Sequence, residues 1–161
     1  MAHEVCCVEA IVDQRQVTVS SCVQARWPSF DPPAANPSVE IWPLDLGDLP
    51  VVEQHYHLAE KPVELAERIN AGSMFGACVE DKLAGFIGVH KEGAMGMLIV
   101  LEAYRGRGIG SALLTYLIRQ ELRRGHIPYS QTFQENQTAM VLQKKVGLEP
   151  QPETIWWLLP Q

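Results

Sequence analysis

The feature that most constrains the fold of this chain is the glycine-rich stretch YRGRGIGS at residues 104–111. An apolar run precedes it at residues 97–101, and a helical pattern follows it over residues 109–124. A strand, a glycine-rich turn and a helix in this order point the unpaired N–H groups and partial positive charge of a helix N-terminus at an anion. The glycines keep side chains away from those donors, and Arg105 and Arg107 add positive charge. The stretch therefore predicts a diphosphate-binding turn.

Several nucleotide-binding motifs share a glycine-rich turn, and two of them do not fit here. The phosphate-loop motif ends in Gly-Lys-Ser/Thr, whereas Gly110 is followed by Ser111 and Ala112. The dinucleotide fingerprint requires a glycine at the position of Ser111. The pattern that fits is Arg/Gln-x-x-Gly-x-Gly/Ala at residues 105–110, which resembles the acyl-CoA signature of the GNAT N-acetyltransferase superfamily.

The resemblance extends over residues 72–160 and is greatest to the glycine N-acyltransferase-like branch. It rests on five spaced motifs in the order of that branch, namely LAGF at 83–86, MLIV at 97–100, EAYRGRG at 102–108, RGHIPYS at 124–130 and Asn136 with KVGL at 145–148. We expect residues 38–161 to form the acyltransferase domain. Residues 1–37 lie outside the resemblance and are predicted to be an N-terminal extension.

The N-terminal extension shows β-like runs at residues 5–12 and 17–20, separated by a polar stretch that could turn between them as a hairpin. Five prolines between residues 28 and 43 then predict an irregular connector, because proline removes a backbone donor and fixes φ. The β-like runs must bury their apolar side chains, and an exposed strand edge invites pairing. We therefore expect a homodimer.

The hydrophobic periodicity of the remaining chain alternates between strands and helices. Strands are expected at residues 39–42, 74–79, 83–90, 97–101, 127–133 and 154–159, and helices at 49–59, 62–71, 109–124 and 136–145. This order predicts an α/β domain with a mixed sheet. The resemblance specifies it as a GNAT-like acyl-CoA N-acyltransferase fold, with a central, mostly antiparallel sheet flanked by helices.

Composition limits the classes of partner. The formal net charge of −6 argues against nucleic acid, and no apolar stretch is long enough to span a bilayer. No secretory signal is visible at the N-terminus. The cysteines at 6, 7, 22 and 78 lack the spacing of a zinc site, so we expect reduced cysteines, no metal and a cytoplasmic protein.

The resemblance implies roles for individual residues in binding acetyl-CoA. Backbone groups of residues 98–100 would pair with the pantetheine amides like an additional strand. The amides of residues 106–111 would hold the diphosphate, and Asn136 would contact the pantetheine arm. Lys144 and Lys145 would either reach a phosphate or complement the negative end of a helix. The implied cofactor-binding set is Leu98, Ile99, Val100, Arg105, Gly106, Arg107, Gly108, Ile109, Gly110, Ser111, Asn136 and Lys145.

Three positions depart from the catalytic pattern of the family. Gln143 stands where many members have a tyrosine that acts as the general acid. Gln131 and Ala94 stand where members have a glutamate that acts as the general base. The carboxylate closest to Ala94 is Glu92, which would share its side of a continuous strand. We expect Glu92 to accept the amine proton through water and Tyr129 or solvent to protonate the thiolate. Equally, Glu92 could be a solvated turn residue.

The resulting function is transfer of an acetyl group from acetyl-CoA to a primary amine of a small molecule or peptide. Because the acid and the base are missing from their usual positions, a non-catalytic acyl-CoA-binding or sensor module is the alternative. A generic nucleotide-binding protein is a third class, which the mismatched phosphate motifs disfavour.

Overall fold

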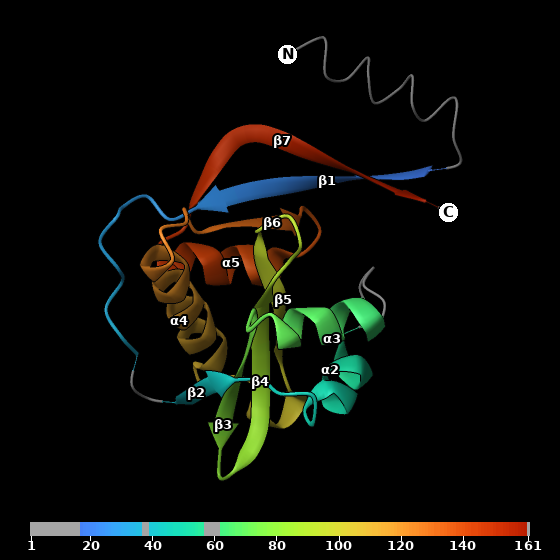
Figure 1. The fold of residues 1–161 in the computed structure, drawn as a ribbon. Coiled ribbons are helices and arrows are strands. Elements are labelled where there is room, and N and C mark those ends of the chain that lie inside the picture. Colours follow the sequence, from blue (N-terminus) through green and yellow to red (C-terminus); the bar gives the residue numbers. More distant parts are fainter. Residues whose placement is uncertain (1–16, 37–38, 57–61, 161) are drawn as a thin grey trace.

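The computed structural model describes residues 17–36, 39–56 and 62–160 (Figure 1). This part of the chain contains seven strands, four α-helices and a short 3₁₀ helix at Glu102–Tyr104. The strands are β1 (Val17–Arg26), β2 (Glu40–Pro43), β3 (Met74–Val79), β4 (Lys82–Val89), β5 (Met95–Val100), β6 (Tyr129–Phe133) and β7 (Glu149–Pro160). The helices are α2 (Leu49–His55), α3 (Pro62–Asn70), α4 (Ile109–Arg123) and α5 (Gln137–Val146).

All seven strands form one sheet in the order β2-β3-β4-β5-β6-β1-β7. Every neighbouring pair is antiparallel except β5 and β6, which are parallel and are joined through α4. A parallel pair needs such a crossover connection, and a helix usually supplies it. The predicted fold class, a mixed and mostly antiparallel sheet flanked by helices, is confirmed.

The hairpin of β3 and β4 shows how local sequence sets the sheet. Glu80 and Asp81 both have positive φ, 52° and 58°, which is the geometry of a two-residue turn that matches strand twist. The predicted turn included Lys82, but Lys82 pairs with Val79 and begins β4. The consequence is a tight hairpin between the second and third strands of the sheet.

Helices cover both faces of the sheet, and each face has its own core. On one face α4 packs against β3, β4 and β5 and against α5, around Phe75, Ile87 and Leu117. On the other face α2 and α3 cover Met74, Phe86 and Met97. Neighbours such as Met74 and Phe75 enter different cores because successive strand side chains point to opposite faces.

The N-terminal region contributes one strand to the sheet. Residues 17–26 form one ten-residue strand, β1, which lies between β6 and β7 and pairs with both. The predicted hairpin partner, residues 5–12, lies outside the described residues. The division of the chain at residue 37 stays a prediction, but β1 is an interior strand of the sheet (Figure 1).

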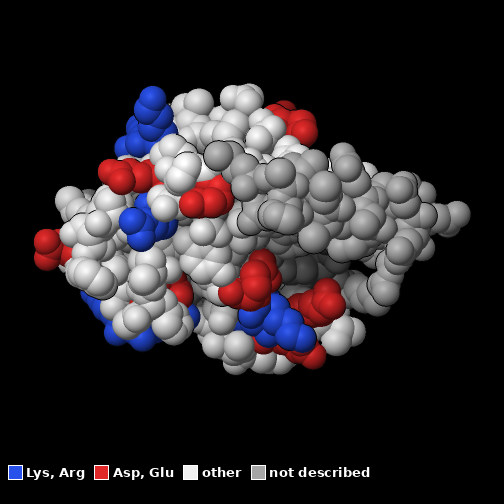
Figure 2. All heavy atoms as spheres, turned by 90° about the horizontal axis from the view of Figure 1, so that it is seen from above, with Lys and Arg blue, Asp and Glu red and all other residues white. Residues whose placement is uncertain are grey.

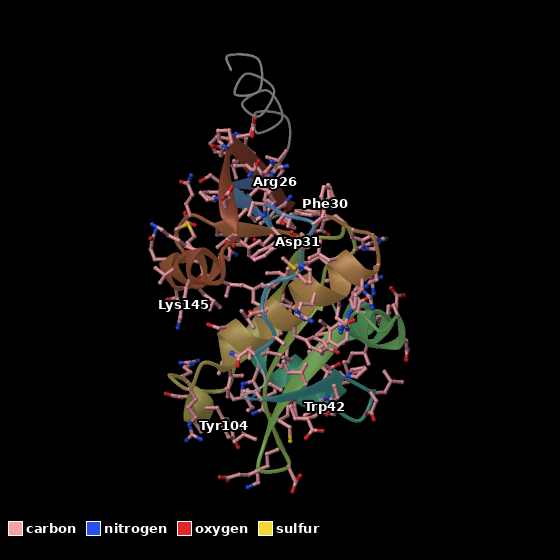
Figure 3. The ribbon with its side chains drawn as sticks, turned by 90° about the vertical axis from the view of Figure 1, so that its left-hand side faces the viewer. Arg26, Phe30, Asp31, Trp42, Tyr104 and Lys145 are labelled. Atoms are coloured by element: carbon pink, nitrogen blue, oxygen red, sulfur yellow. The ribbon has the colours of Figure 1, made fainter. Side chains whose placement is uncertain are left out.

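The proline-rich connector is confirmed as irregular where the structure describes it, over residues 27–36. Trp27 packs against the core beside α4 and donates its indole N–H to the Asp31 carbonyl at 2.8 Å. Arg119 of α4 donates to the Pro33 carbonyl. The bond from Arg119 fastens the connector to α4, while Phe30 stays exposed (Figure 3).

Candidate functional site

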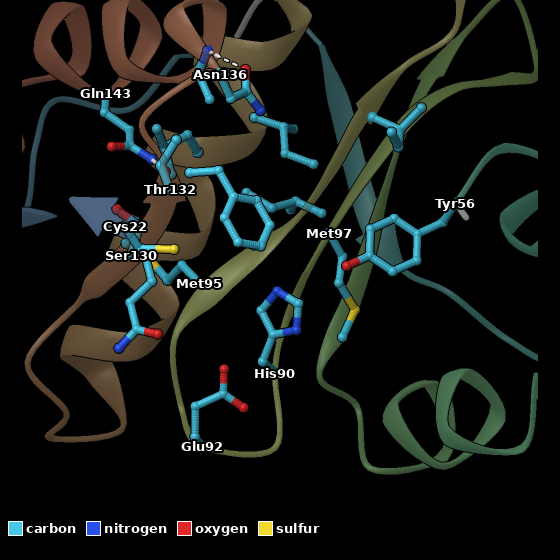
Figure 4. A pocket seen from close by; sticks show the side chains of 18 of the residues that line it. Cys22, Tyr56, His90, Glu92, Met95, Met97, Ser130, Thr132, Asn136 and Gln143 are labelled. Carbon is cyan, nitrogen blue, oxygen red and sulfur yellow. Dashed lines mark hydrogen bonds between the residues drawn. The ribbon is translucent and has the colours of Figure 1, made fainter. Parts of the chain in front are cut away.

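The candidate site lies where β5 and β6 separate. The two strands pair only at Met95 and Ser130 within the described sheet, and beyond that point they diverge. A cavity of about 550 Å³ occupies the opening. Figure 4 shows Thr132 and Gln143 on one side of it, Tyr56 and Met97 on the opposite side, and Asn136 and Glu92 at its two ends.

A β-bulge in β5 forms one wall of the cavity. Gly88 pairs with Gly96 and Phe86 with Ile99, so Met97 and Leu98 together stand opposite Ile87. Met97 has a φ of +52°, a left-handed conformation that costs a residue with a side chain about 1–2 kcal/mol. Bulges bend a strand and change the direction of its backbone groups. The bulge therefore leaves Leu98 without a paired residue on β4 or on β6, in the region predicted to bind the pantetheine amides.

The turn before α4 has the predicted anion-binding geometry. Gly108 is the N-cap residue with φ +79°, and no side chain caps the helix. The first helical hydrogen bond runs from the Ala112 N–H to the Gly108 carbonyl at 3.0 Å. The N–H groups of residues 109–111 therefore belong to the donors that a helix leaves unpaired. No atom lies within 4 Å of where a Cβ at Gly106 or Gly108 would be, so an anion has open access to the turn.

The two arginines of the turn are held by neighbouring groups. Arg105 donates its Nε–H to the Val100 carbonyl at 3.2 Å, and the Arg107 guanidinium lies 5.5 Å from the centre of the Tyr104 ring. A cation over an aromatic ring is attracted by its electron-rich face. Both arginines remain exposed, and their roles in phosphate binding stay predictions.

The short helix α5 carries Asn136 at its N-terminus and Lys145 in its last turn. Asn136 is the N-cap residue, and its Oδ1 accepts the Ala139 N–H at 3.1 Å. Because that oxygen is used by the cap, the Nδ2 donors of Asn136 are the groups left for a ligand in the cavity. Lys145 lies exposed in the last turn of α5, on the same side of the molecule as Tyr104 (Figure 3).

The two glutamines that depart from the family pattern both make side-chain hydrogen bonds at the cavity wall. Gln143 donates from Nε2 to the Thr132 hydroxyl at 2.6 Å. Gln131 donates to the Gln24 side chain at 3.3 Å and accepts the Trp157 indole N–H at 3.0 Å. The second network joins β6 to β1 and β7, so it fixes the Gln131 amide.

The predicted catalytic pair Glu92 and Tyr129 meets at the turn before β5. Glu92 is exposed and lines the cavity, while the Tyr129 hydroxyl donates to the Glu92 backbone carbonyl at 2.6 Å. Burial, and secondarily the Glu92 charge, raises the pKa of Tyr129 above its ordinary value. The expectation that Glu92 and Ala94 share a strand face is wrong, because residues 91–93 form a turn and β5 begins at Met95. Their proposed roles stay predictions.

Several residues at the cavity were not selected from the sequence. Tyr56 comes from the end of α2, Cys22 from β1, Thr132 from β6 and Trp157 from β7. His90 also lines the cavity, and its ring packs directly over Gly96, where a Cβ would lie only 2.2 Å from the histidine Nε2. No local motif marks these residues, because strand pairing over long distances in sequence brings them together.

One face of the molecule carries side chains of both charges. Figure 2 shows cationic and anionic side chains interspersed over one face of the molecule. Among the described residues no group of histidine, cysteine, aspartate or glutamate side chains is arranged to hold a metal ion. None of the helices in the described ranges has the length and apolar character needed to cross a membrane.

A comparison of the chain with models of protein families shows to which family it belongs. The family model of the acetyltransferase (GNAT) family matches residues 38–148, more than half of the chain. The chain belongs to the GNAT acetyltransferase family. Members of this family typically use acetyl-CoA, which agrees with the features of the β5 bulge and the α4 N-terminus. No curated protein matches this GNAT chain.

Solved structures share the GNAT-like fold. A Drosophila protein aligns with a TM-score of 0.79 at 21% identity, over 94% of this chain and 55% of its own. A protein assigned to the GNAT family from Novosphingobium aromaticivorans aligns at 0.71 and 20% identity, over 90% and 66%. A GCN5-related N-acetyltransferase from Sphaerobacter thermophilus aligns at 0.66 and 19% identity, over 92% and 54%. The chain thus spans between about half and two thirds of the length of these structures, and identities this low establish the fold alone.

Proposed function

We propose that the chain transfers an acetyl group from acetyl-CoA to the primary amine of a small-molecule or peptide acceptor. One observation carries the proposal: a cavity opens between β5 and β6 beside a strand bulge, and residues from α5 and from the β4–β5 turn line its two ends. A donor and an acceptor can therefore enter from different sides and meet at the bulge. Family membership supports acetyl-CoA as the donor.

The groups present at the site fit acetyl-CoA, whose thioester supplies the activated acetyl group. The N–H groups of residues 109–111 and the helix dipole suit the diphosphate. Leu98, unpaired at the bulge, suits an amide of the pantetheine arm, and Asn136 offers its Nδ2 donors. The Val100 carbonyl already accepts a hydrogen bond from Arg105. We therefore place the backbone contacts with pantetheine at Leu98 and Ile99 rather than at the Val100 carbonyl.

The acceptor end of the cavity suits an amine. Glu64 and Glu67 of α3 line it together with Glu92, and Arg68 and Lys91 balance part of their charge. A free alkyl amine has a pKa near 10, so it arrives protonated and must lose a proton before it can attack. We assign that proton to Glu92, directly or through water, because the Glu92 carboxylate is at the cavity and the usual glutamate positions are Gln131 and Ala94.

The role of Glu92 predicts the kinetics of a Glu92→Gln variant. Loss of a general base lowers kcat by about 100-fold near neutral pH and less at high pH, where more of the amine is already neutral. The measurement is the kcat profile between pH 6 and 9 with an amine that the chain acetylates. A variant with wild-type kcat across that range would remove Glu92 from the mechanism.

Two finer assignments, the branch of the family and the oligomeric state, are part of the proposal. The motifs at residues 83–86, 97–100 and 124–130 favour the glycine N-acyltransferase-like branch. A homodimer is proposed because β7 is an outer strand of the sheet within the described residues, and such an edge can pair with another strand. Light scattering of the full chain decides the second point, and a monomer at micromolar concentration would exclude it.

A non-catalytic acyl-CoA-binding module is the second candidate function. Gln131 and Gln143 favour it, because neither side chain titrates and both are engaged with neighbours. The test that separates the candidates is a mass-spectrometric screen of an amine library with acetyl-CoA. The transferase predicts an acetylated amine and free CoA, whereas binding of CoA with no acetylated product from the library would favour the module.

A further inference from the structure

We propose that the Thr132 hydroxyl, oriented by Gln143, donates a hydrogen bond to the sulfur of CoA and stabilises the departing thiolate. The inference rests on the proposed function, since it needs CoA in the cavity between β5 and β6. It assigns Thr132 a catalytic role and Gln143 a positioning role, at the place where the family acid is missing.

The inference rests on the hydrogen bonds that the Thr132 hydroxyl makes. Its side chain lies at the cavity wall and the residue is only 6% exposed. The Thr132 Oγ1 accepts the Gln143 Nε2–H at 2.6 Å, so the hydroxyl proton itself is left to be donated. No acceptor for that proton is found among the described residues. A buried hydroxyl usually has its donor satisfied, and a molecule in the cavity is the partner that remains.

The position of Thr132 fits an acceptor at the thioester. Ser130 is the residue of β6 that pairs with β5, and Thr132 lies two residues further along, where the strands have diverged. Ser130 and Thr132 face the same side of β6 because strand side chains alternate. Figure 4 shows Thr132 between Asn136, at the end proposed for the pantetheine arm, and Glu92, at the end proposed for the amine.

The chemistry of the transfer requires a place for negative charge. The acceptor nitrogen forms a bond to the acetyl carbon, the carbon–sulfur bond breaks, and its electron pair leaves on sulfur. The ammonium gives its first proton to Glu92 or to water before the attack, and the nitrogen gives its second proton to water once the bond to the acetyl carbon has formed. A hydrogen bond to an ionised acceptor is stronger than one to a neutral acceptor, and the donor chain from Gln143 through Thr132 strengthens it further. The thiolate is therefore stabilised without an acidic tyrosine.

The test measures the pKa of the bound thiol and needs no acceptor amine. Calorimetry gives the affinity of the full chain for CoA and for desulfo-CoA, which lacks the sulfur, between pH 6 and 10. A free thiol has a pKa of about 8.5. If the bound thiolate is stabilised, its pKa is lower, so CoA affinity rises with pH up to about 8.5 relative to desulfo-CoA. In Thr132→Val the pKa of the bound thiol rises by about one unit, which lowers CoA affinity about tenfold at pH 9.

The comparison with desulfo-CoA removes the contributions of other ionisable groups at the cavity. On α2 and α3 these are Tyr56, Glu64, Glu67 and Arg68. The turn after β4 contributes His90, Lys91 and Glu92, and β1 contributes Cys22. Each of them affects both ligands, whereas the thiol is present only in CoA. An unchanged affinity for desulfo-CoA also shows that Thr132→Val is folded, since valine has nearly the shape of threonine.

Matched variants separate the catalytic from the positioning role. Thr132→Ser keeps a hydroxyl and retains most of the pKa shift. Gln143→Met removes the donor that orients the hydroxyl, and we expect a loss of about threefold in the same affinity ratio. In the Thr132→Val background, Gln143→Met has no further effect on that ratio, because Gln143 acts through the hydroxyl.

Two results would overturn the inference, and they are distinguishable. Normal CoA binding with the same bound-thiol pKa in wild type and Thr132→Val would overturn this inference and leave the proposed function in place. Failure of the wild-type chain to bind CoA at all would overturn the proposed function and the inference with it.

Discussion

At the scale of the residue, Cys22 shows how the sheet changes the chemistry of a side chain that the sequence marks only as small and apolar. The residue is a free thiol, 2% exposed, on the wall of the cavity. Burial, and secondarily the negative charge of Glu135, raises the pKa of Cys22 to about 11. The thiol therefore stays protonated in the folded protein at pH values where an exposed cysteine ionises.

This raised pKa predicts a fall in stability in alkaline solution. The unfolded thiol, with its ordinary pKa near 9, loses its proton first, so ionisation stabilises the unfolded state as pH rises from about 9 to 11. The free energy of unfolding falls by up to about 1.4 kcal/mol per pH unit from this residue. Denaturant titrations of wild type and Cys22→Ala measure it. Parallel pH profiles for the two proteins would contradict the prediction, whereas a shallower fall in the variant supports it.

At the scale of the element, α5 combines a structural and a proposed binding role in one residue. The Asn136 Oδ1 caps the helix, while its Nδ2 is the group proposed to contact pantetheine. Serine caps helices about as well as asparagine does, but its hydroxyl is shorter and lacks the amide donors. One substitution can therefore remove the proposed contact and keep the helix.

We expect Asn136→Ser to retain wild-type stability within about 0.5 kcal/mol and to bind CoA about 5- to 20-fold more weakly. Asn136→Ala serves as the control for the cap, since it loses about 1 kcal/mol of stability as well. Thermal unfolding and calorimetry give the two quantities. If Asn136→Ser bound CoA like the wild type, Asn136 would be a capping residue alone.

Elements with a strong local signal could be predicted from the sequence. The glycine stops at Gly125 and Gly147, the cap at Asn136 and the strand at residues 74–79 all lie where the sequence indicates. Each depends on backbone conformation or capping within a few residues. Gly93 and Gly96 indicate a bulge or a close backbone approach near the start of β5, but the position of the bulge at Met97 depends on how β5 pairs with β4. The turn at residues 91–93 lies between two expected strands, and it agrees with the alternative that Glu92 is a turn residue.

At the scale of the whole molecule, β1 shows which part of the fold the sequence does not indicate. Its residues were predicted to belong to an extension, yet β1 separates β6 from β7 in the sheet. Val23 pairs with both Thr132 and Thr154, more than one hundred positions away in the chain. Sequence patterns give the alternation of a strand but not its neighbours. The position of Cys22 at the cavity depends on this pairing, which is why the sequence did not indicate it.

The place of β1 predicts the effect of truncation. A chain that starts at Val39 lacks β1, so β6 and β7 both lose their pairing partner. We expect it to unfold at least 15 °C below the full chain or to aggregate, since unpaired strand edges associate. A chain that starts at Val17 keeps every described strand and is the control. Circular dichroism melting of the three chains checks this. A stable, monomeric Val39 chain would show that β1 is dispensable for the sheet.

The central claim, that the α4 N-terminus holds the diphosphate of CoA, has a direct test in two matched glycines. Gly108 and Gly125 have nearly the same φ, +79° and +78°, and neither has an atom within 4 Å of where its Cβ would be. Leucine at either position therefore costs a similar strain, about 1–2 kcal/mol, at opposite ends of the same helix.

Calorimetric titration of CoA into the two variants is the decisive measurement. We expect Gly108→Leu to weaken CoA binding at least about 30-fold, because its side chain obstructs the N–H groups of residues 109–111, each of which is worth about 1.5–3 kcal/mol to a charged group. Gly125→Leu should bind CoA like the wild type while losing the same stability. A folded Gly108→Leu variant with wild-type affinity would contradict the assignment of the site.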